Sequence, residues 1–271
     1  MNAIIHDFTV DPQGVTTLVP SPKPMTLKAA REIAGSTSCR NTKMPGGSFA
    51  VSAFACKVGD KLAKIEGSTC HKCYARKLEN MRPSVAQGWT ANTRKAVDLI
   101  ARDPDQWVSA MVKQVERDAR VTGQPYFRWF DSGDLQSVEM LSAICQVAVM
   151  TPEVRHWLPT REAAMVKRYR KAGGYVPSNL IIRVSATMVD DSPIAAHEHT
   201  STVHRKGSQP YGHACPANRT HAAPDGSFEV IPPETFKALK RAEKRAYDLG
   251  HCGNCRACWS AEVPNVSYGL H

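Results

Sequence analysis

Three short apolar segments, separated by segments with helical patterns, constrain the fold of this chain more than any other feature. Residues 126–130, 156–159 and 179–187 are rich in aromatic and branched side chains, as β-strands are. Between them, residues 137–150 and 162–172 carry apolar residues at helical spacing. Strands that alternate with helices of about 10–15 residues form parallel βαβ units. The sequence therefore predicts an α/β fold with a parallel sheet.

The rest of the chain predicts more helices and long irregular segments. Helical patterns cover residues 26–36, 84–101, 105–120 and a strongly basic stretch over 234–249, which Gly250 ends. Irregular structure is predicted for residues 1–25, 39–73 and 190–232. A chain of 271 residues is long enough for one large α/β domain. We predict a lead-in over residues 1–40 and a single domain over 41–271.

The charge and hydropathy pattern restrict the partners and the location. A net charge of +10 is typical of proteins that bind nucleic acid, and also of proteins with a merely solvated basic surface. The basic helix predicted over 234–249 is the candidate contact for nucleic acid. No apolar run approaches the roughly 20 residues of a membrane helix, and the N-terminus has no signal-peptide pattern. We therefore expect no membrane contact and a cytoplasmic location.

A run of three cysteines near the C-terminus predicts a metal site. The chain has nine cysteines, and a reducing compartment disfavours structural disulfides between them. Cys252, Cys255 and Cys258 are separated by two residues each, a spacing that bacterial ferredoxins use to hold a [4Fe–4S] cluster with a fourth, distant cysteine. Zinc sites more often use paired C-x2-C knuckles. Cys215, which Pro216 follows, is the predicted fourth ligand.

A second cysteine group lies in the N-terminal half. Cys70 and Cys73 form another C-x2-C pair, with Cys56 upstream. Three interpretations stay open: a second cluster held by three thiolates with one iron open to a ligand, a single site shared with the C-terminal run, or a zinc knuckle completed by His71 or Cys39.

Polar residues follow each of the three predicted strands. Asp131, Gly133 and Asp134 follow the first strand, Arg161 follows the second, and Ser185 ends the third. In parallel α/β folds the carboxyl ends of the strands form the binding site. Carboxylates there suit an ammonium group and an arginine suits a carboxylate or phosphate. The alternative is structural, since aspartates also cap turns and helices.

Several motifs together resemble a phage protein family called gene product 88. They are Asn41-Thr-Lys-Met-Pro45, Cys70-x-x-Cys73-Tyr74-Ala75, Arg128-Trp-x-Asp131-Ser-Gly-Asp134 and the closing Cys-x-x-Cys-x-x-Cys-Trp. The resemblance covers about residues 40 to 260. It implies a viral or prophage origin, and hence the host cytoplasm, and it implies no particular activity.

The layout also resembles the radical SAM superfamily. That resemblance implies a partial (β/α) TIM-like barrel with cysteine-rich loops at both ends, and S-adenosylmethionine (SAM) as a second cofactor. Gly133 and Asp134 would then lie near the SAM amino group, Arg161 near its carboxylate, and Ser185 on the next strand end. The superfamily triad is C-x3-C-x2-C, whereas here thirteen residues separate Cys56 from Cys70.

Two hypotheses about function follow. The first is an iron–sulfur protein on a radical-SAM-like scaffold that acts as a redox or SAM-dependent enzyme. The second is a non-enzymatic protein, stabilised by an iron–sulfur cluster or zinc, that binds nucleic acid or a host protein. An enzyme of the first kind needs an iron with only three protein ligands, whereas a nucleic-acid binder shows affinity that falls steeply with salt.

Overall fold

A seven-stranded parallel sheet forms the centre of the molecule. The computed structural model describes residues 7–10, 16–19, 22–39, 41, 43–223, 225, 227–244 and 246–270. The strand order is β3(Gly47–Phe49), β4(Tyr126–Trp129), β5(Arg155–Thr160), β6(Leu180–Ser185), β7(Thr200–His204), β11(Asn265–Gly269) and β8(His213–Ala214). Every neighbouring pair is parallel. The predicted α/β class with a parallel sheet is confirmed, and the sheet is open, with β3 and β8 at its edges.

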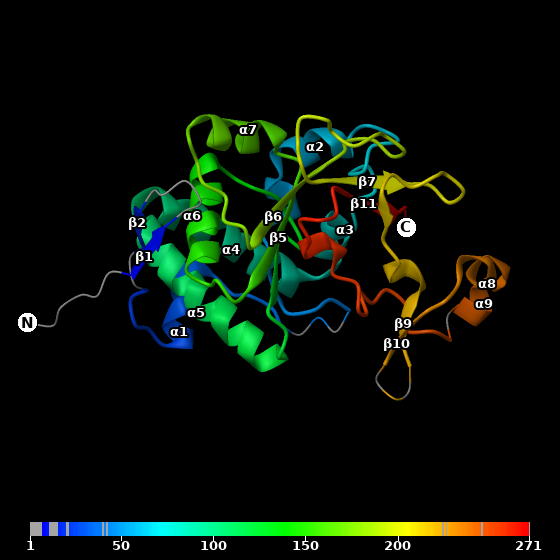
Figure 1. Cartoon of the computed structure of the whole chain (residues 1–271), viewed down its shortest axis with the longest axis horizontal. Coiled ribbons are helices and arrows are strands. Elements are labelled where there is room, and N and C mark those ends of the chain that lie inside the picture. The colour runs from blue at the N-terminus through cyan, green and yellow to red at the C-terminus, as the bar shows by residue number, and fades with distance from the viewer. Residues whose placement is uncertain are drawn as a thin grey trace, which may run out of the picture.

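Helices cover one face of this sheet (Figure 1). They are α1(Leu27–Ala34), α4(Pro83–Arg102), α5(Pro104–Thr122), α6(Val138–Val149) and α7(Ala163–Lys171). All five lie where the sequence predicts helices. Asp103 caps α5 by accepting a hydrogen bond from the backbone N–H of Gln106 at 3.0 Å, and Pro104 occupies the first helical position. Their apolar faces pack on Phe127, Trp129, Leu158, Ile182 and other side chains of alternate strand positions.

The opposite face of the sheet is covered by loops and by the cysteine run. A smaller apolar cluster forms there from Met44, Trp157, Ala257, Cys258, Trp259 and Val266. The residues 257–259 form a short 3₁₀ helix, η3(Ala257–Trp259), against β5 and β6. Because strand side chains alternate between faces, Arg128, Trp157 and Arg183 also point to this side.

All three stretches predicted to be irregular contain regular structure. The range 39–73 holds β3 and α2(Lys57–Ala63), and 190–232 holds β7, β8 and the hairpin β9(Thr220–Ala222)–β10(Phe228–Val230). The lead-in holds the hairpin β1(Asp7–Val10)–β2(Thr16–Val19). These strands have two to five residues, too few for their periodicity to stand out in the sequence. Tertiary pairing therefore decides their conformation.

The prediction of one continuous basic helix over 234–249 is wrong. Two short helices, α8(Pro233–Ala238) and α9(Arg241–Lys244), occupy its place, and Leu239 between them is extended. No residue of α8 is buried, so no apolar face stabilises a longer helix. With β9 and β10 these helices form a small unit at one end of the molecule (Figure 1). The nucleic-acid contact expected from this segment stays a prediction, on two short helices in place of a continuous one.

Helix α1 belongs to the same core as the sheet, through Ala30 and Ala34. The division at residue 40 stays a prediction, and that residue itself lies outside the described part of the chain. Among the residues that the structure describes, no helix has the length and apolar character needed to span a membrane.

Candidate functional site

The three cysteines of the N-terminal half lie together. Cys56 immediately precedes α2, and Cys73 immediately precedes α3(Tyr74–Met81). A methyl group added to Gly59 would lie 3.6 Å from Cys56 Sγ and 3.7 Å from Cys70 Sγ, so both sulfurs border the same small space. Cys70 and Cys73 both lie close enough to Cys56 to interact with it electrostatically. We call Cys56, Cys70 and Cys73 the three-cysteine group.

The loop that carries this group is fastened over the carboxyl ends of β5 and β6. The backbone N–H of Thr69 donates to the carbonyl of Thr187 at 2.9 Å, just beyond β6. Arg161 Nε donates to Thr69 Oγ1 at 3.0 Å, and the backbone N–H of Val58 donates to Glu162 Oε1 at 2.8 Å, just beyond β5. The three-cysteine group therefore lies at the edge of the sheet where the sequence predicts a binding site.

Asp134 joins two strand ends. Its Oδ1 accepts from Thr160 Oγ1 at 2.6 Å and from the backbone N–H of Leu135 at 2.8 Å, and its Oδ2 accepts from the backbone N–H of Arg161 at 2.9 Å. Burial raises the pKa of Asp134 to about 6, although these hydrogen bonds oppose the shift. Asp134 therefore fixes β5 relative to β4 from inside the protein.

Gly133 also has a structural role. Its φ is +78°, and a Cβ there would lie 2.3 Å from Val51 Cγ2 and 2.7 Å from the Val51 carbonyl oxygen. A side chain is thus excluded by backbone conformation and by the close approach of the segment after β3. Gly133 and Asp134 have structural reasons to be present whether or not a cofactor binds.

Two other predicted strand-end residues, Asp131 and Ser185, make hydrogen bonds within the protein. Asp131 Oδ2 accepts from Ser48 Oγ at 2.9 Å, while its Oδ1 is buried and has no hydrogen-bond partner among the described residues. Ser185 Oγ shares a hydrogen bond with Ser201 Oγ at 2.9 Å. Buried polar atoms are normally paired, so this oxygen of Asp131 can accept a hydrogen bond from a bound group.

Burial favours the protonated thiols of Cys56 and Cys70 when no metal is bound. The pKa of Cys56 is raised to about 12, first by burial and then by the charge of Asp134. Burial also raises the pKa of Cys70. A metal that binds these sulfurs would have to displace their protons, which makes binding pH-dependent.

The four cysteines of the C-terminal half form a second group. Cys215 follows β8, and its backbone N–H donates to the carbonyl of Ser267 at 2.8 Å. Cys215 and Cys255 lie close enough to Cys252 to interact with it electrostatically, and so do Cys215 and Cys252 to Cys258. Burial is the largest cause that raises the pKa of Cys258 to about 12 and of Cys252 to about 11. We call Cys215, Cys252, Cys255 and Cys258 the four-cysteine group. The sequence predicts the same four cysteines together.

Arg183 of β6 fastens the segment that carries this group. Its side chain is fully buried, and its guanidinium donates to the carbonyl oxygens of Ala257 at 2.8 Å, Cys258 at 3.1 Å and Ser260 at 2.9 Å. Longer contacts reach Thr200 and Pro264. One side chain thus holds the chain around the last cysteine against the sheet.

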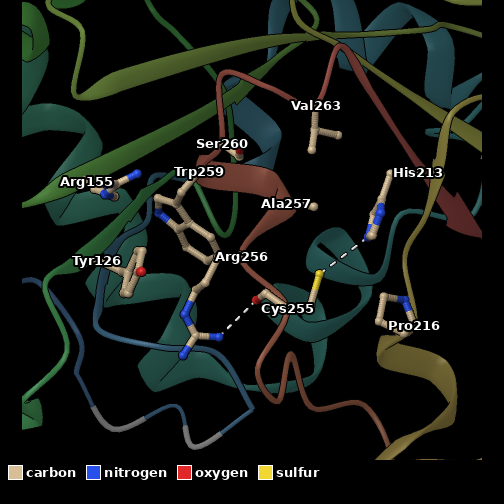
Figure 2. A pocket seen from close by; sticks show the side chains of 10 residues that line it. All are labelled: Tyr126, Arg155, His213, Pro216, Cys255, Arg256, Ala257, Trp259, Ser260 and Val263. Atoms are coloured by element: carbon tan, nitrogen blue, oxygen red, sulfur yellow. Dashed lines mark hydrogen bonds between the residues drawn. The ribbon is translucent and has the colours of Figure 1, made fainter.

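Two side chains contact the sulfurs directly. Tyr268 Oη lies 3.2 Å from Cys258 Sγ, and His213 Nε2 lies 3.4 Å from Cys255 Sγ. Figure 2 shows Cys255 and His213 facing each other on the wall of a cavity of about 470 Å³. Its described lining includes Arg155 and Arg256 but no carboxylate. The four-cysteine group therefore has one sulfur near solvent, and Cys258 is buried.

Arg128 lies between the two groups. Burial disfavours its charged form, but Tyr74, Asp131, Tyr268 and Cys258 outweigh this, so its pKa is raised above the usual value. Its guanidinium stacks 4.7 Å from the ring centroid of Trp157. Its Nε is buried without a partner, and no carboxylate among the described residues forms an ion pair with it. An unpaired cation in this position favours nearby negative charge.

The sulfurs of the two groups do not gather as they would around a single ion. In the described part of the chain, no three His, Cys, Asp or Glu side chains form a group that could hold one metal ion. Four thiolates on one zinc would stand about 3.8 Å apart, as the 2.3 Å Zn–S bond requires. Cys39 lies elsewhere, with Arg117 Nη1 2.9 Å from its sulfur, and Cys145 is buried in the helical core as expected.

Comparison with known proteins gives the family. The sequence matches a family described as Gene product 88 over residues 23–261, nearly the whole chain. The chain belongs to the gene product 88 family. The predicted family membership is thereby confirmed, and the family name supports the expectation of a phage protein. No curated protein and no solved structure matches the sequence significantly.

The sequence reading of this gene product 88 protein missed several residues of the site. Arg128, Arg183 and Tyr268 all point from strands towards the cysteine groups. Arg128 and Arg183 each interrupt an apolar strand, and a charge in such a strand is a signal that could have been used. Tyr268 lies on β11, a strand that the sequence did not predict.

Proposed function

We propose that this gene product 88 protein is an iron–sulfur protein with two sites of different character, one at the carboxyl ends of its strands and one on the sheet face opposite the helices. The four-cysteine group would hold a closed [4Fe–4S] cluster. The three-cysteine group would hold a second cluster with one iron open to a ligand. The single observation that carries the proposal is the gathering of seven cysteines into a set of four and a set of three, the latter beside polar strand ends.

The chemistry of the residues fits such groups. Thiolates are the ligands of iron–sulfur clusters, and two-residue spacers suit the run at Cys252. A cluster held by four thiolates carries net negative charge, and the unpaired guanidinium of Arg128 would offset it. A reducing compartment, such as the host cytoplasm, would keep the thiols available.

The proposed activity is a redox or SAM-dependent reaction at the strand ends. An open iron supplies a coordination position for a small molecule. The chain would orient that molecule with the free oxygen of Asp131 and the half-buried guanidinium of Arg161, while Asp134 and Gly133 hold the strand ends in place. Ser185 would border the same space. The radical-SAM-like partial barrel belongs to this proposal.

The test is anaerobic purification followed by iron, sulfide and zinc analysis and a visible absorption spectrum. We expect about eight irons for two cubanes, with about half lost in Cys252→Ala and in Cys70→Ala. Cys145→Ala, which removes a thiol of the helical core, is the matched control and should keep all the iron. Zinc in place of iron would leave the second hypothesis, a metal-stabilised protein without catalysis. Equal loss of all iron in both variants would mean one shared site.

A further inference from the structure

Helix α3 exposes an apolar stripe at the mouth of the strand-end site. Tyr74, Leu78 and Met81 are 61%, 36% and 63% exposed, and their spacing of four and three residues places them on one side of the helix. Ala75 and Glu79 lie buried on another side. Tyr74 directly follows Cys73, and its hydroxyl donates to the carbonyl of Asp131 at the end of β4. The stripe therefore begins where the three-cysteine group and the strand ends meet.

The segment that carries this stripe is rich in positive charge and has no exposed carboxylate of its own. Residues 70–97 contain six lysines and arginines and a single acid, Glu79. Glu79 is buried and accepts from Ser52 Oγ at 2.6 Å and from the backbone N–H of Ala53 at 2.9 Å. From outside the segment, Asp60 forms ion pairs with Arg76 of this helix and with Lys64.

Three of these cations flank the stripe and are free to bind. Lys72 precedes the helix, Lys77 lies beside the stripe and Arg82 follows Met81, and all three are exposed. None of the three forms an ion pair with any residue in the described ranges. An exposed aromatic ring between unpaired cations matches the arrangement with which proteins hold single-stranded nucleic acid, through base stacking and phosphate contacts.

We propose that α3 and the turn after it bind single-stranded nucleic acid, with a base stacked on Tyr74 and phosphates on Lys72, Lys77 and Arg82. The stripe is about 10 Å long, at 1.5 Å per helical residue. That is too short for a stable protein interface, which buries about 1,200 Å² or more, but it suits two or three nucleotides. A base on Tyr74 lies beside the three-cysteine group. Binding of the strand does not depend on the proposed function. Only its use as a substrate of the three-cysteine site rests on that function.

Fluorescence anisotropy with a labelled oligonucleotide of about 12 nucleotides tests the proposal on the full-length protein. We expect binding of single-stranded DNA or RNA at about 50 mM salt, with log K falling against log salt at a slope of about −2, since three cations each contribute about 0.7. Duplex of the same length should bind more weakly. Binding should be the same in metal-free and iron-loaded protein, so that a failure of the proposed function and a failure of this proposal are separate results.

Matched variants separate this surface from overall charge. Lys77→Glu/Arg82→Glu and Lys167→Glu/Lys171→Glu each lower the net charge from +10 to +6, and Lys167 and Lys171 are exposed on α7. The first pair should weaken binding at least tenfold, and the α7 pair should have a much smaller effect. Tyr74→Ala should weaken binding about fivefold or more, whereas Tyr74→Phe, which keeps the ring, should not.

Three results would overturn the proposal. They are no binding at low salt, equal losses in the two double variants, and binding of polyglutamate as tight as that of the oligonucleotide with no effect of Tyr74→Ala. The last result would assign the surface to an acidic protein instead.

Discussion

Replacing Arg183 by methionine should loosen the four-cysteine segment even before any metal binds. The carbonyl oxygens of Cys258 and Ser260 accept from Arg183 and from no other described residue. Each buried acceptor left unpaired costs about 1–3 kcal/mol, so the two together give about 2–6 kcal/mol. Arg183→Lys should recover less than half of this, because an ammonium cannot reach several carbonyls in the planar arrangement of a guanidinium.

Urea denaturation of the metal-free, reduced protein measures the free energy of unfolding, and alkylation followed by peptide mass spectrometry measures the protection of Cys258. Arg155→Met is the matched control, because Arg155 is an exposed arginine of the neighbouring strand β5. We expect Arg183→Met to lose several kcal/mol and to expose the Cys258 thiol, while Arg155→Met changes stability by less than about 0.5 kcal/mol. If the two variants unfold alike and Cys258 stays protected in both, the role assigned to Arg183 is refuted.

Three further predictions concern other parts of the fold. Burial lowers the pKa of His156 to about 3, so its contribution to the free energy of unfolding is complete above about pH 6.5 and is lost as the pH falls. The loss is about 1 kcal/mol per pH unit between pH 6 and 4. Urea titrations of His156→Gln should show a smaller change of the free energy of unfolding with pH. Arg128→Met should lower the reduction potential of the iron-loaded protein in a redox titration, because a nearby positive charge favours the reduced cluster, and an unchanged potential would contradict this. Gly133→Ala should destabilise by more than Gly123→Ala in thermal unfolding, since both have positive φ but only Gly133 meets Val51; equal losses would mean that the contact is unimportant.

Sequence patterns predict the helical side of this protein well and the other side poorly. The helices and the strands β4, β5 and β6 are long or strongly apolar, so their periodicity is visible. Strands β3, β7, β8 and β11 have two to five residues and take their conformation from their neighbours in the sheet. The basic segment after residue 233 has helical propensity but no buried face, and it breaks at Leu239. Propensity alone could not show this.

The candidate site divides in the same way. Cysteine spacing predicts which thiols belong together, because short spacers keep ligands within reach of one cluster. It could not predict Arg128 or Tyr268, which approach the thiols only through the order of the strands. For Gly133 and Asp134, the sequence suggests more function than the structure requires. The two residues suggest a cofactor motif, yet contacts with Val51, Thr160 and Arg161 already account for both.

The position of β11 has a consequence for the order in which the molecule can assemble. Residues 265–269 lie between β7 and β8 and pair with both, although both precede them in the chain. During synthesis, residues 200–204 and 213–214 therefore cannot pair with β11 until it leaves the ribosome, some fifty residues later. Cys215, next to β8, reaches its place only when that partner arrives. Completion of the sheet and assembly of the four-cysteine group are thus a single late event, which follows translation of the whole segment.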